Sequence, residues 1–249
     1  MDSILQDKSM LYRKSGRDSR KARMRISVII PVYNEEKVLK EIIDRVKSVT
    51  IVDEIVVVDD CSSQGTQDVL DLIQDASIKI IKHPYNRGKG AAIRTGLAHI
   101  TGDIVIIQDA DLEYDPRDYK NLVEPIENGK ADVVYGSRFL LKKWKASTMF
   151  HCLVNQFLTS LTNMLFFSHL SDMETCYKVF RTEIIRSLGL TSDRFEIEPE
   201  ITIRTLKRGH RIYEVPVSYR PRSYGEGNKI GWLDGLKAVY AILKYRIKK

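Results

Sequence analysis

Asp109, Asp111 and Glu113 follow a short apolar run, with one residue between each of them and the next. In an extended segment this spacing places the three carboxylates on one side of the chain. Carboxylates gathered together raise one another's pKa, and a hard divalent cation such as Mg²⁺ or Mn²⁺ relieves that repulsion. Such cations commonly bridge to the phosphates of a substrate. The pattern favours a metal site over a solvated acidic turn.

Asp59 and Asp60 end a second apolar run and precede Cys61 and Ser62. A carboxylate at the end of a buried strand can accept hydrogen bonds from a nucleobase or from ribose hydroxyls. Asp and Ser are also residues that prefer turns and helix caps. Taken alone, the pair is more typical of a cap than of a binding site.

A glycine-rich turn runs from Asn86 to Ala92 and opens a predicted helix. Glycine allows a ligand to approach the backbone closely, and the N-terminus of a helix favours phosphate. Ile93 stands where a dinucleotide-binding fingerprint needs its third glycine, so that fingerprint is absent. A phosphate site that includes Lys89 and a plain glycine turn with exposed cations are equally supported.

Basic side chains stand in two other segments. Arg138 ends a Gly-Ser-Arg motif after the fifth predicted strand, and Arg220, Arg222 and Lys229 lie in a glycine-rich stretch. Arginines beside a metal-bound phosphate can neutralise a leaving diphosphate or hold a phosphate acceptor. The simpler alternative for the second segment is a mobile basic loop.

Five short β-branched runs alternate with segments of helical periodicity. The predicted strands are 26–31, 54–59, 78–81, 103–108 and 132–135, and the predicted helices are 35–49, 67–74, 88–99 and 118–128. This alternation implies an α/β fold with a mostly parallel sheet flanked by helices. In such sheets ligands bind at the carboxyl ends of strands, which is where the aspartates and Arg138 stand.

Two apolar stretches with helical spacing follow. Residues 146–171 contain no Asp, Glu, Lys or Arg, and the stripe that begins at Trp232 continues to the basic C-terminus. Each is either a helix that docks on the core or an amphipathic helix that lies in a membrane interface. No run reaches about 18 consecutive apolar residues, so no transmembrane helix is expected.

The 249-residue chain has a formal net charge of +7. Three scattered cysteines argue against a disulfide framework or a zinc site. Most of the positive charge is at the ends: residues 1–25 hold eight basic and three acidic side chains, and residues 237–249 hold five basic and no acidic ones. This distribution favours an anionic membrane surface over nucleic acid as the partner.

Several motifs together resemble those of a known family. Pro31-Val-Tyr-Asn-Glu-Glu36, Val58-Asp-Asp-Cys-Ser62, Asp109-Ala-Asp111 and Gly136-Ser-Arg138 resemble the motifs of family 2 glycosyltransferases, which have the GT-A fold, a Rossmann-like α/β architecture. Asn86 to Gly96, Asp172 to Phe180 and Tyr213 to Val217 are similar to segments of the polyprenyl-phosphate sugar synthases. The resemblance covers roughly residues 26–237. It implies a catalytic domain at 26–230. The charge and the apolar spacing predict a flexible basic arm at 1–25 before it and a basic amphipathic helix at 231–249 after it.

The resemblance also implies an activity. It is the inverting transfer of a hexose from a nucleotide sugar of the GDP-mannose or UDP-glucose type to a dolichyl or undecaprenyl phosphate, by a peripheral protein at the cytoplasmic face of a membrane. The nucleotide sugar would contact Pro31, Tyr33, Glu35, Asp59, Asp60, Lys89 and Asp109. Mg²⁺ or Mn²⁺ would be held by Asp109, Asp111 and Glu113, and the acceptor phosphate by Arg138, Arg222 and Lys229. Asp111, Arg138 and Arg222 would be the catalytic residues.

Other functions remain open at this point. A soluble family 2 enzyme that glycosylates a glycan or protein hydroxyl would need a general base, for which Asp172 and Glu198 are candidates. Glu196 and Glu198 are also candidates for acceptor contacts, although helix capping is more typical of their position. A nucleic-acid binder would explain the charge but not the acidic motifs, and a nucleotidyltransferase would need a glycine-rich signature near the first strand.

Overall fold

The computed structural model describes residues 23–140, 149–222 and 232–247. Lys229 and most of the predicted N-terminal arm therefore lie outside the described residues. The end of that arm belongs to the folded body, because Arg23 pairs with Asp53 at 3.2 Å and the Arg25 N–H donates to Asp103.

The centre of the molecule is a seven-stranded mixed sheet with the order β3-β2-β1-β4-β6-β5-β7. The strands are β1 (Ile26–Val32), β2 (Glu54–Asp59), β3 (Ile78–Lys82), β4 (Ile104–Ile107), β5 (Val133–Ser137), β6 (Lys178–Arg181) and β7 (Ile212–Pro216). The helices are α1 (Leu39–Lys47), α2 (Gln64–Asp71), α3 (Lys89–His99), η1 (Pro116–Asp118), α4 (Tyr119–Glu127), α5 (Met149–Phe166), α6 (Thr182–Ser187), α7 (Ile197–Lys207) and α8 (Trp232–Ile247). The predicted α/β class is confirmed.

β6 and β7 have no counterpart in the sequence prediction. β6 lies antiparallel between β4 and β5, and β7 pairs parallel to β5 at the edge of the sheet. β6 is only four residues long and begins with Lys178, while β7 contains Glu214 and ends at Pro216. Neither has the long apolar run that identifies a buried strand.

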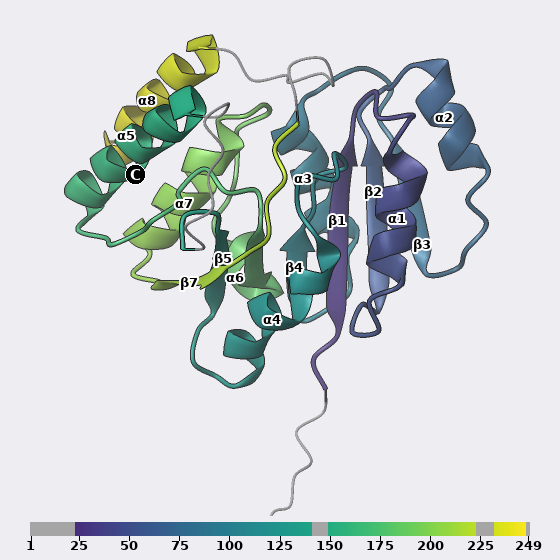
Figure 1. The fold of residues 1–249 in the computed structure, drawn as a ribbon, viewed down its shortest axis with the longest axis horizontal. Helices are drawn as coiled ribbons and strands as arrows, with labels where there is room; N and C mark the ends of the chain where they lie inside the picture. Colours follow the sequence, from purple (N-terminus) through teal and green to yellow (C-terminus); the bar gives the residue numbers. More distant parts are fainter. Residues whose placement is uncertain (1–22, 141–148, 223–231, 248–249) are drawn as a thin grey trace, which may run out of the picture.

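Helices cover both faces of the sheet (Figure 1). Alternate residues of β1 point to opposite faces, so that Val28 and Ile30 pack with α1 and α4, whereas Ile29 packs with α3 and α7. Because β1, β2, β4 and β5 run in the same direction, their carboxyl ends meet at one edge of the sheet. That edge carries the predicted site.

α5 and α8 form an outer layer over α7 (Figure 1). Leu158 of α5, Ile203 of α7 and Ile242 of α8 are among the residues that pack together there. The opposite side of α5 exposes Leu153 and Phe157, each 60% accessible. The docking alternative is therefore confirmed for α5, and the membrane-interface alternative stays a prediction. No helix within the described ranges is long and apolar enough to cross a membrane.

Candidate active site

The acidic segment after β4 is a turn, and the predicted extended segment is wrong. β4 ends at Ile107, and Leu112 has a φ of 61°, in the left-handed region. Asp109, Asp111 and Glu113 therefore do not alternate along a strand. Among the described residues, no three potential metal-ligating side chains already form a cluster.

Two of these carboxylates have partners from distant segments. Asp109 pairs with Lys89, with the ammonium nitrogen 2.7 Å from Oδ1. Glu113 accepts hydrogen bonds from the hydroxyl of Tyr219 at 3.0 Å and from the backbone N–H of Arg222 at 2.9 Å. The turn is thus joined to the start of α3 on one side and to the segment after β7 on the other.

Asp111 is held differently. Its Oδ1 accepts the Glu113 backbone N–H at 3.0 Å, and no ion pair reaches it within the part of the chain that the structure describes. Burial, reinforced by the negative charges of Asp109 and Glu113, raises the pKa of Asp111 to about 7. A carboxylate without a cationic partner fits a hard divalent cation, which in phosphate-binding sites commonly uses one or two carboxylates plus substrate oxygens. Asp111 is the residue best placed to hold it.

Arg222 joins the segment that follows β1 to the acidic turn. Its guanidinium donates to both carboxylate oxygens of Glu35, at 3.2 and 2.9 Å, and its Nε donates to the backbone carbonyl of Asp111 at 2.9 Å. Pro31 lies in β1, and Tyr33 follows that strand with 42% of its surface exposed. These predicted residues therefore meet at the same edge of the sheet.

Asp59 is buried at the end of β2. Its Oδ1 accepts the Ser62 backbone N–H at 3.0 Å, which is the turn-capping role considered from the sequence. Its Oδ2 is buried and receives no hydrogen bond from any described residue. Because buried polar oxygens are normally satisfied, Oδ2 is an acceptor available to a ligand donor such as a base N–H.

The carboxylate of Asp60 is engaged by other residues of the protein. Its carboxylate contacts His83 Nδ1 at 2.7 Å and accepts hydrogen bonds from the Asn86 amide and from the backbone N–H groups of Arg87 and Gly88. These contacts fix the turn that begins α3. The structure therefore gives Asp60 a role in holding the loop beside the site.

The glycines of that turn serve close packing. A Cβ atom at Gly88 would lie 2.5 Å from the carbonyl oxygen of Asp193, and one at Gly90 would lie 2.3 Å from that of Ser192. Gly88 also has a φ of 97°. Lys89 is not the exposed cation of the simpler alternative, because only 12% of its side chain is accessible and it pairs with Asp109.

A buried ion network lies behind Lys89. Glu198 of α7 contacts Lys89 at 2.9 Å and also pairs with Lys178 of β6. Burial favours the protonated acid, but the two ammonium groups prevail and hold the pKa of Glu198 near 2. The interpretation of Glu198 as a helix cap is wrong, and Glu196 makes no side-chain capping bond either. Sequence reasoning missed Lys178, because a lysine inside a short strand gives no sign of its partner.

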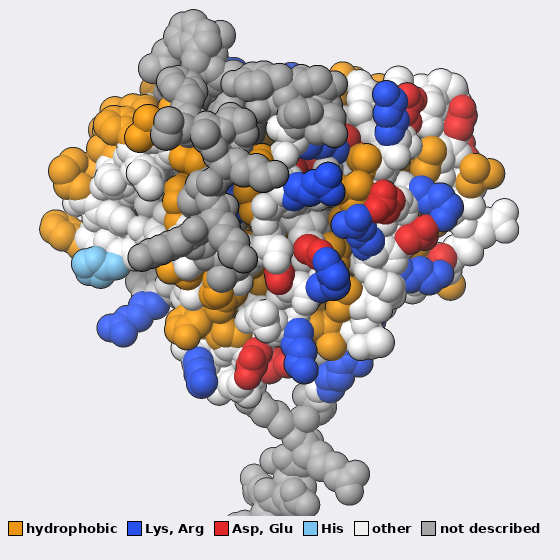
Figure 2. All heavy atoms as spheres, in the orientation of Figure 1, with side chains coloured by type: hydrophobic (Ala, Val, Ile, Leu, Met, Phe, Trp, Pro, Cys, Tyr) orange, Lys and Arg blue, Asp and Glu red, His pale blue; other side chains and the backbone are white. Residues whose placement is uncertain are grey.

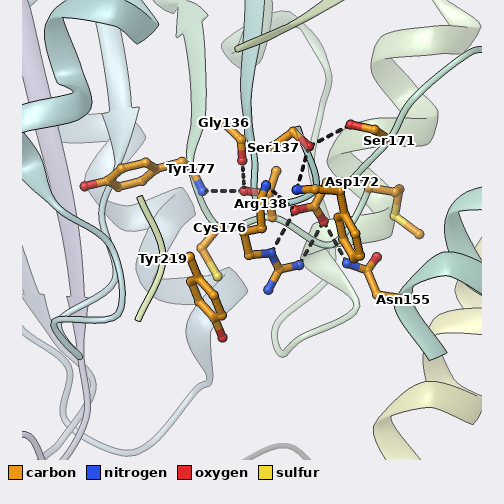
Figure 3. Close-up of polar contacts among 12 residues, drawn as sticks. Gly136, Ser137, Arg138, Asn155, Ser171, Asp172, Cys176, Tyr177 and Tyr219 are labelled. Carbon is orange, nitrogen blue, oxygen red and sulfur yellow. Dashed lines mark hydrogen bonds and ion pairs between the residues drawn. The ribbon is translucent and has the colours of Figure 1, made fainter. Parts of the chain in front are cut away.

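Arg138 is held by Asp172 (Figure 3). The Arg138 backbone N–H, Nε and Nη2 all donate to that carboxylate, at 3.0, 2.8 and 2.8 Å. Asn155 donates to the same carboxylate at 2.7 Å. The guanidinium carbon also lies 5.1 Å from the ring centre of Tyr219, a cation–π contact. Burial opposes ionisation of Asp172, but Arg138 prevails and lowers the pKa of this carboxyl.

Tyr219 links the two halves of the site and was not found from the sequence. Its ring lies under Arg138, and its hydroxyl donates to Glu113 of the acidic turn. The only local signal is its position three residues before Arg222. The metal-side carboxylates and the buried arginine are therefore parts of one connected edge.

Comparison with known proteins defines the family. Residues 27–189 match the family model described as glycosyl transferase family 2. The chain belongs to this family. It is 28% identical over 233 residues to the dolichol-phosphate mannosyltransferase of Pyrococcus furiosus, which covers 89% of this chain but 64% of that protein's length. It is also 28% identical to the undecaprenyl-phosphate mannosyltransferase of Micrococcus luteus, over 87% of this chain and 92% of the relative.

Solved structures confirm the GT-A fold. The glucosyl-3-phosphoglycerate synthase of Mycobacterium tuberculosis, in complex with Mn²⁺, UDP-glucose and phosphoglyceric acid, superposes with a TM-score of 0.69 at 22% identity, covering 91% of this chain and 81% of that one. Another structure of that enzyme contains Mg²⁺ and UDP. At this identity the likeness establishes the fold of this family 2 glycosyltransferase, and the metal and nucleotide are properties of the neighbour.

Proposed function

We propose that this family 2 glycosyltransferase moves a hexose from a GDP-mannose- or UDP-glucose-type donor to a polyprenyl phosphate, with inversion, at the cytoplasmic face of a membrane. Relatives named for transfer to dolichol phosphate and undecaprenyl phosphate support the class of acceptor. The observation that carries the proposal is the pairing of the buried carboxylates with cationic side chains. Asp172 and Glu198, the candidate bases for a hydroxyl acceptor, are both held in ion pairs with buried cations.

A phosphate acceptor needs no strong base, since its second ionisation is nearly complete near pH 7. A hydroxyl acceptor needs a group that can take its proton. Asp172 and Glu198 both have lowered pKa values and cationic partners, which makes them poor bases. This contrast favours the lipid phosphate over a glycan or protein hydroxyl.

The donor would lie over the ends of β1, β2 and β4. The free Oδ2 of Asp59 would accept a hydrogen bond from the base or ribose, with Pro31 and Tyr33 nearby. Asp111, with support from Asp109, would hold a divalent cation, which when bound would neutralise charge on the donor diphosphate. Arg222 would reach the phosphates by exchanging its pairing with Glu35.

The chemical step would then depend mainly on orientation and charge. An oxygen of the acceptor phosphate attacks C1 of the sugar from the face opposite the nucleoside diphosphate. The bond from C1 to the diphosphate oxygen breaks, the configuration at C1 inverts, and the electron pair leaves with the diphosphate. Arg138 would hold the attacking phosphate, and Arg222 would stabilise charge on the leaving group.

The outer layer supports action at a membrane surface. Figure 2 shows hydrophobic side chains over the α5–α8 layer, whereas charges of both signs cover the end formed by α1 and α2. Leu153 and Phe157 of α5 and Tyr240 and Leu243 of α8 are exposed, and the ammonium of Lys244 lies 6.0 Å from the ring centre of Tyr240. An apolar face with adjacent cations is suited to an anionic lipid interface.

A donor and acceptor panel tests the proposal. Purified protein is assayed with UDP-glucose, GDP-mannose and UDP-N-acetylglucosamine, each with Mn²⁺ and either a polyprenyl phosphate or a free sugar acceptor. We expect a lipid-linked product with one preferred donor, and loss of product on chelation with EDTA. Transfer only to the sugar acceptor would favour the hydroxyl-acceptor enzyme instead.

A further inference from the structure

Asn155 of α5 lies behind the Arg138–Asp172 pair and has no role in the chemistry described above. It is 7% exposed, and its side-chain amide donates to Oδ1 of Asp172 at 2.7 Å. Oδ1 is the same oxygen that accepts Nη2 of Arg138, while Oδ2 accepts Nε and the backbone N–H. Figure 3 shows these contacts converging on one carboxylate. Asn155 therefore helps to fix the carboxylate that orients the arginine.

The neighbouring contacts determine which end of the Asn155 amide faces Asp172. Thr159 Oγ1 accepts the backbone N–H of Met173 at 3.1 Å, and the Thr159 hydroxyl donates to Oδ1 of Asn155 at 3.1 Å. With its oxygen engaged in this way, Asn155 presents its NH₂ group to the carboxylate. The amide is thus oriented by its own helix and by the segment that carries Asp172.

Asp172 and Tyr219 together hold the guanidinium of Arg138 in one position. Asp172 takes Nε and Nη2, and the Tyr219 ring contacts the guanidinium by a cation–π interaction. Nη1 makes no hydrogen bond to any residue in the described ranges and remains as a donor for an incoming anion. A rotation of the Asp172 carboxylate would turn this donor away.

We propose that Asn155 is a positioning residue for acceptor recognition, which holds Asp172 and thereby aims Arg138 at the acceptor phosphate. The inference rests on the proposed function. It also gives α5 a second role, because Leu153 and Phe157 on the opposite side of the same helix turns are exposed. One rigid helix then connects the apolar outer face to the phosphate-binding arginine.

The test uses Asn155→Ala and Asn155→Asp in the full-length chain, with Gln156→Ala as the matched control. Gln156 is the next residue of α5, also carries an amide, and is exposed. The acceptor is a short isoprenyl phosphate that is soluble in dilute detergent, which removes membrane binding from the measurement. The KM for each substrate, kcat and the melting temperature are measured for every variant.

Loss of a hydrogen bond to a buried carboxylate commonly corresponds to a factor of ten or more in an equilibrium constant. We expect Asn155→Ala to raise the acceptor KM about tenfold while the donor KM stays within about twofold. Asn155→Asp should raise it further, because it sets a second carboxylate against Asp172. Gln156→Ala should leave both KM values unchanged.

An unchanged acceptor KM in a folded Asn155 variant overturns the positioning role, as does an equal rise in both KM values. Should both Asn155 variants fail to fold, Asn155→Leu decides, because it is neutral, has a similar volume and removes the hydrogen bond to Asp172. Calorimetric binding of the isoprenyl phosphate adds a readout that needs no turnover. If the wild-type protein neither binds nor glycosylates the lipid phosphate, both the proposed function and this inference are wrong. If the wild-type protein transfers the sugar and the Asn155 variants do so equally well, only the inference is wrong.

Discussion

At the scale of single residues, ion pairs dominate the site. Arg138, Arg222 and Lys89 each contact a carboxylate, so an incoming anion has to join or exchange an existing pair. Asp111 differs because no cation within the described chain forms an ion pair with it, and its pKa is raised to about 7. This makes Asp111 the residue whose charge a divalent cation would compensate.

Asp111→Asn keeps the size of the side chain but removes the charge that a divalent cation needs. We expect transfer activity with Mn²⁺ to fall by about a hundredfold or more, with little change in melting temperature. The control is Asp115→Asn in the same segment, because Asp115 caps η1 through a backbone N–H and asparagine can cap in the same way. Near-normal activity of Asp111→Asn would exclude it as the metal-holding residue.

Glu174 gives a pH-dependent prediction about stability. Burial, partly opposed by Lys178 and reinforced by Glu198, raises its pKa to about 7, and its Oε1 has no hydrogen-bond partner among the described residues. The folded state holds this proton more tightly than the unfolded state, so the contribution to stability is present below pH 4.5 and is lost as the pH rises through about 7.

Glu174→Gln removes the loss of stability that the ionisation of Glu174 causes at high pH. We expect the variant to exceed wild type in free energy of unfolding by about 1–3 kcal/mol at pH 8, with a much smaller difference at pH 4.5. Urea denaturation at the two pH values measures it, with the exposed Glu124→Gln on α4 as the control. A difference that does not change with pH would show that Glu174 ionises normally.

At the scale of secondary structure, α5 and α8 would determine how the domain meets a lipid surface under the proposed function. Leu158 and Ile242 anchor them on α7, so their outward faces are held in a fixed relation to the site. A helix that is anchored on one side can expose apolar groups on the other without loss of fold. The exposed residues are therefore suited to mutation, because they contribute little to the core.

Replacing Leu153 and Phe157 with serine should weaken binding to anionic vesicles by about tenfold or more, since each side chain would bury apolar surface in the interface. The melting temperature should not fall, because both residues are 60% exposed. Vesicle cosedimentation provides the measurement. Leu72→Ser is the control, since Leu72 is 82% exposed at the end of α2, far from this layer. Equal loss in the control would mean that the effect is not specific to α5.

At the scale of the whole molecule, the positive charge lies mainly outside the segment that forms the catalytic body. The chain carries +7 overall, but the positive excess is concentrated before residue 26 and after residue 236. The catalytic body between these ends is slightly acidic, as expected for a site rich in carboxylates. Electrostatic attraction to an anionic surface would then act mainly through the two ends of the chain.

Binding to vesicles that contain anionic lipid should therefore weaken as ionic strength rises, and deletion of residues 1–22 should weaken it several-fold further. Each basic residue near such a surface contributes roughly 1 kcal/mol, and salt screens this attraction beyond about 10 Å at 0.1 M. Vesicles of neutral phosphatidylcholine serve as the comparison. Binding that is independent of both salt and the deletion would contradict an electrostatic role for the N-terminal segment.

The sequence by itself determined the α/β class and the edge of the sheet where the site lies. Runs such as 26–31 and 54–59 bury β-branched residues on both faces, and a chain that alternates such runs with amphipathic helices has few ways to cover a sheet. The motifs at Asp59, Asp109 and Arg138 follow these runs directly. Their common location is therefore a consequence of parallel strand direction.

Only the tertiary structure decided which charges meet. Arg138 and Asp172 are 34 residues apart, and Arg222 and Glu35 are 187 apart. Local spacing holds no information about such pairs, because the antiparallel insertion of β6 and the return of the chain after β7 bring them together. The same packing buried Glu198 between two lysines and gave Asp111 no ion pair with any residue in the described ranges. Both results depend on what surrounds a side chain in three dimensions.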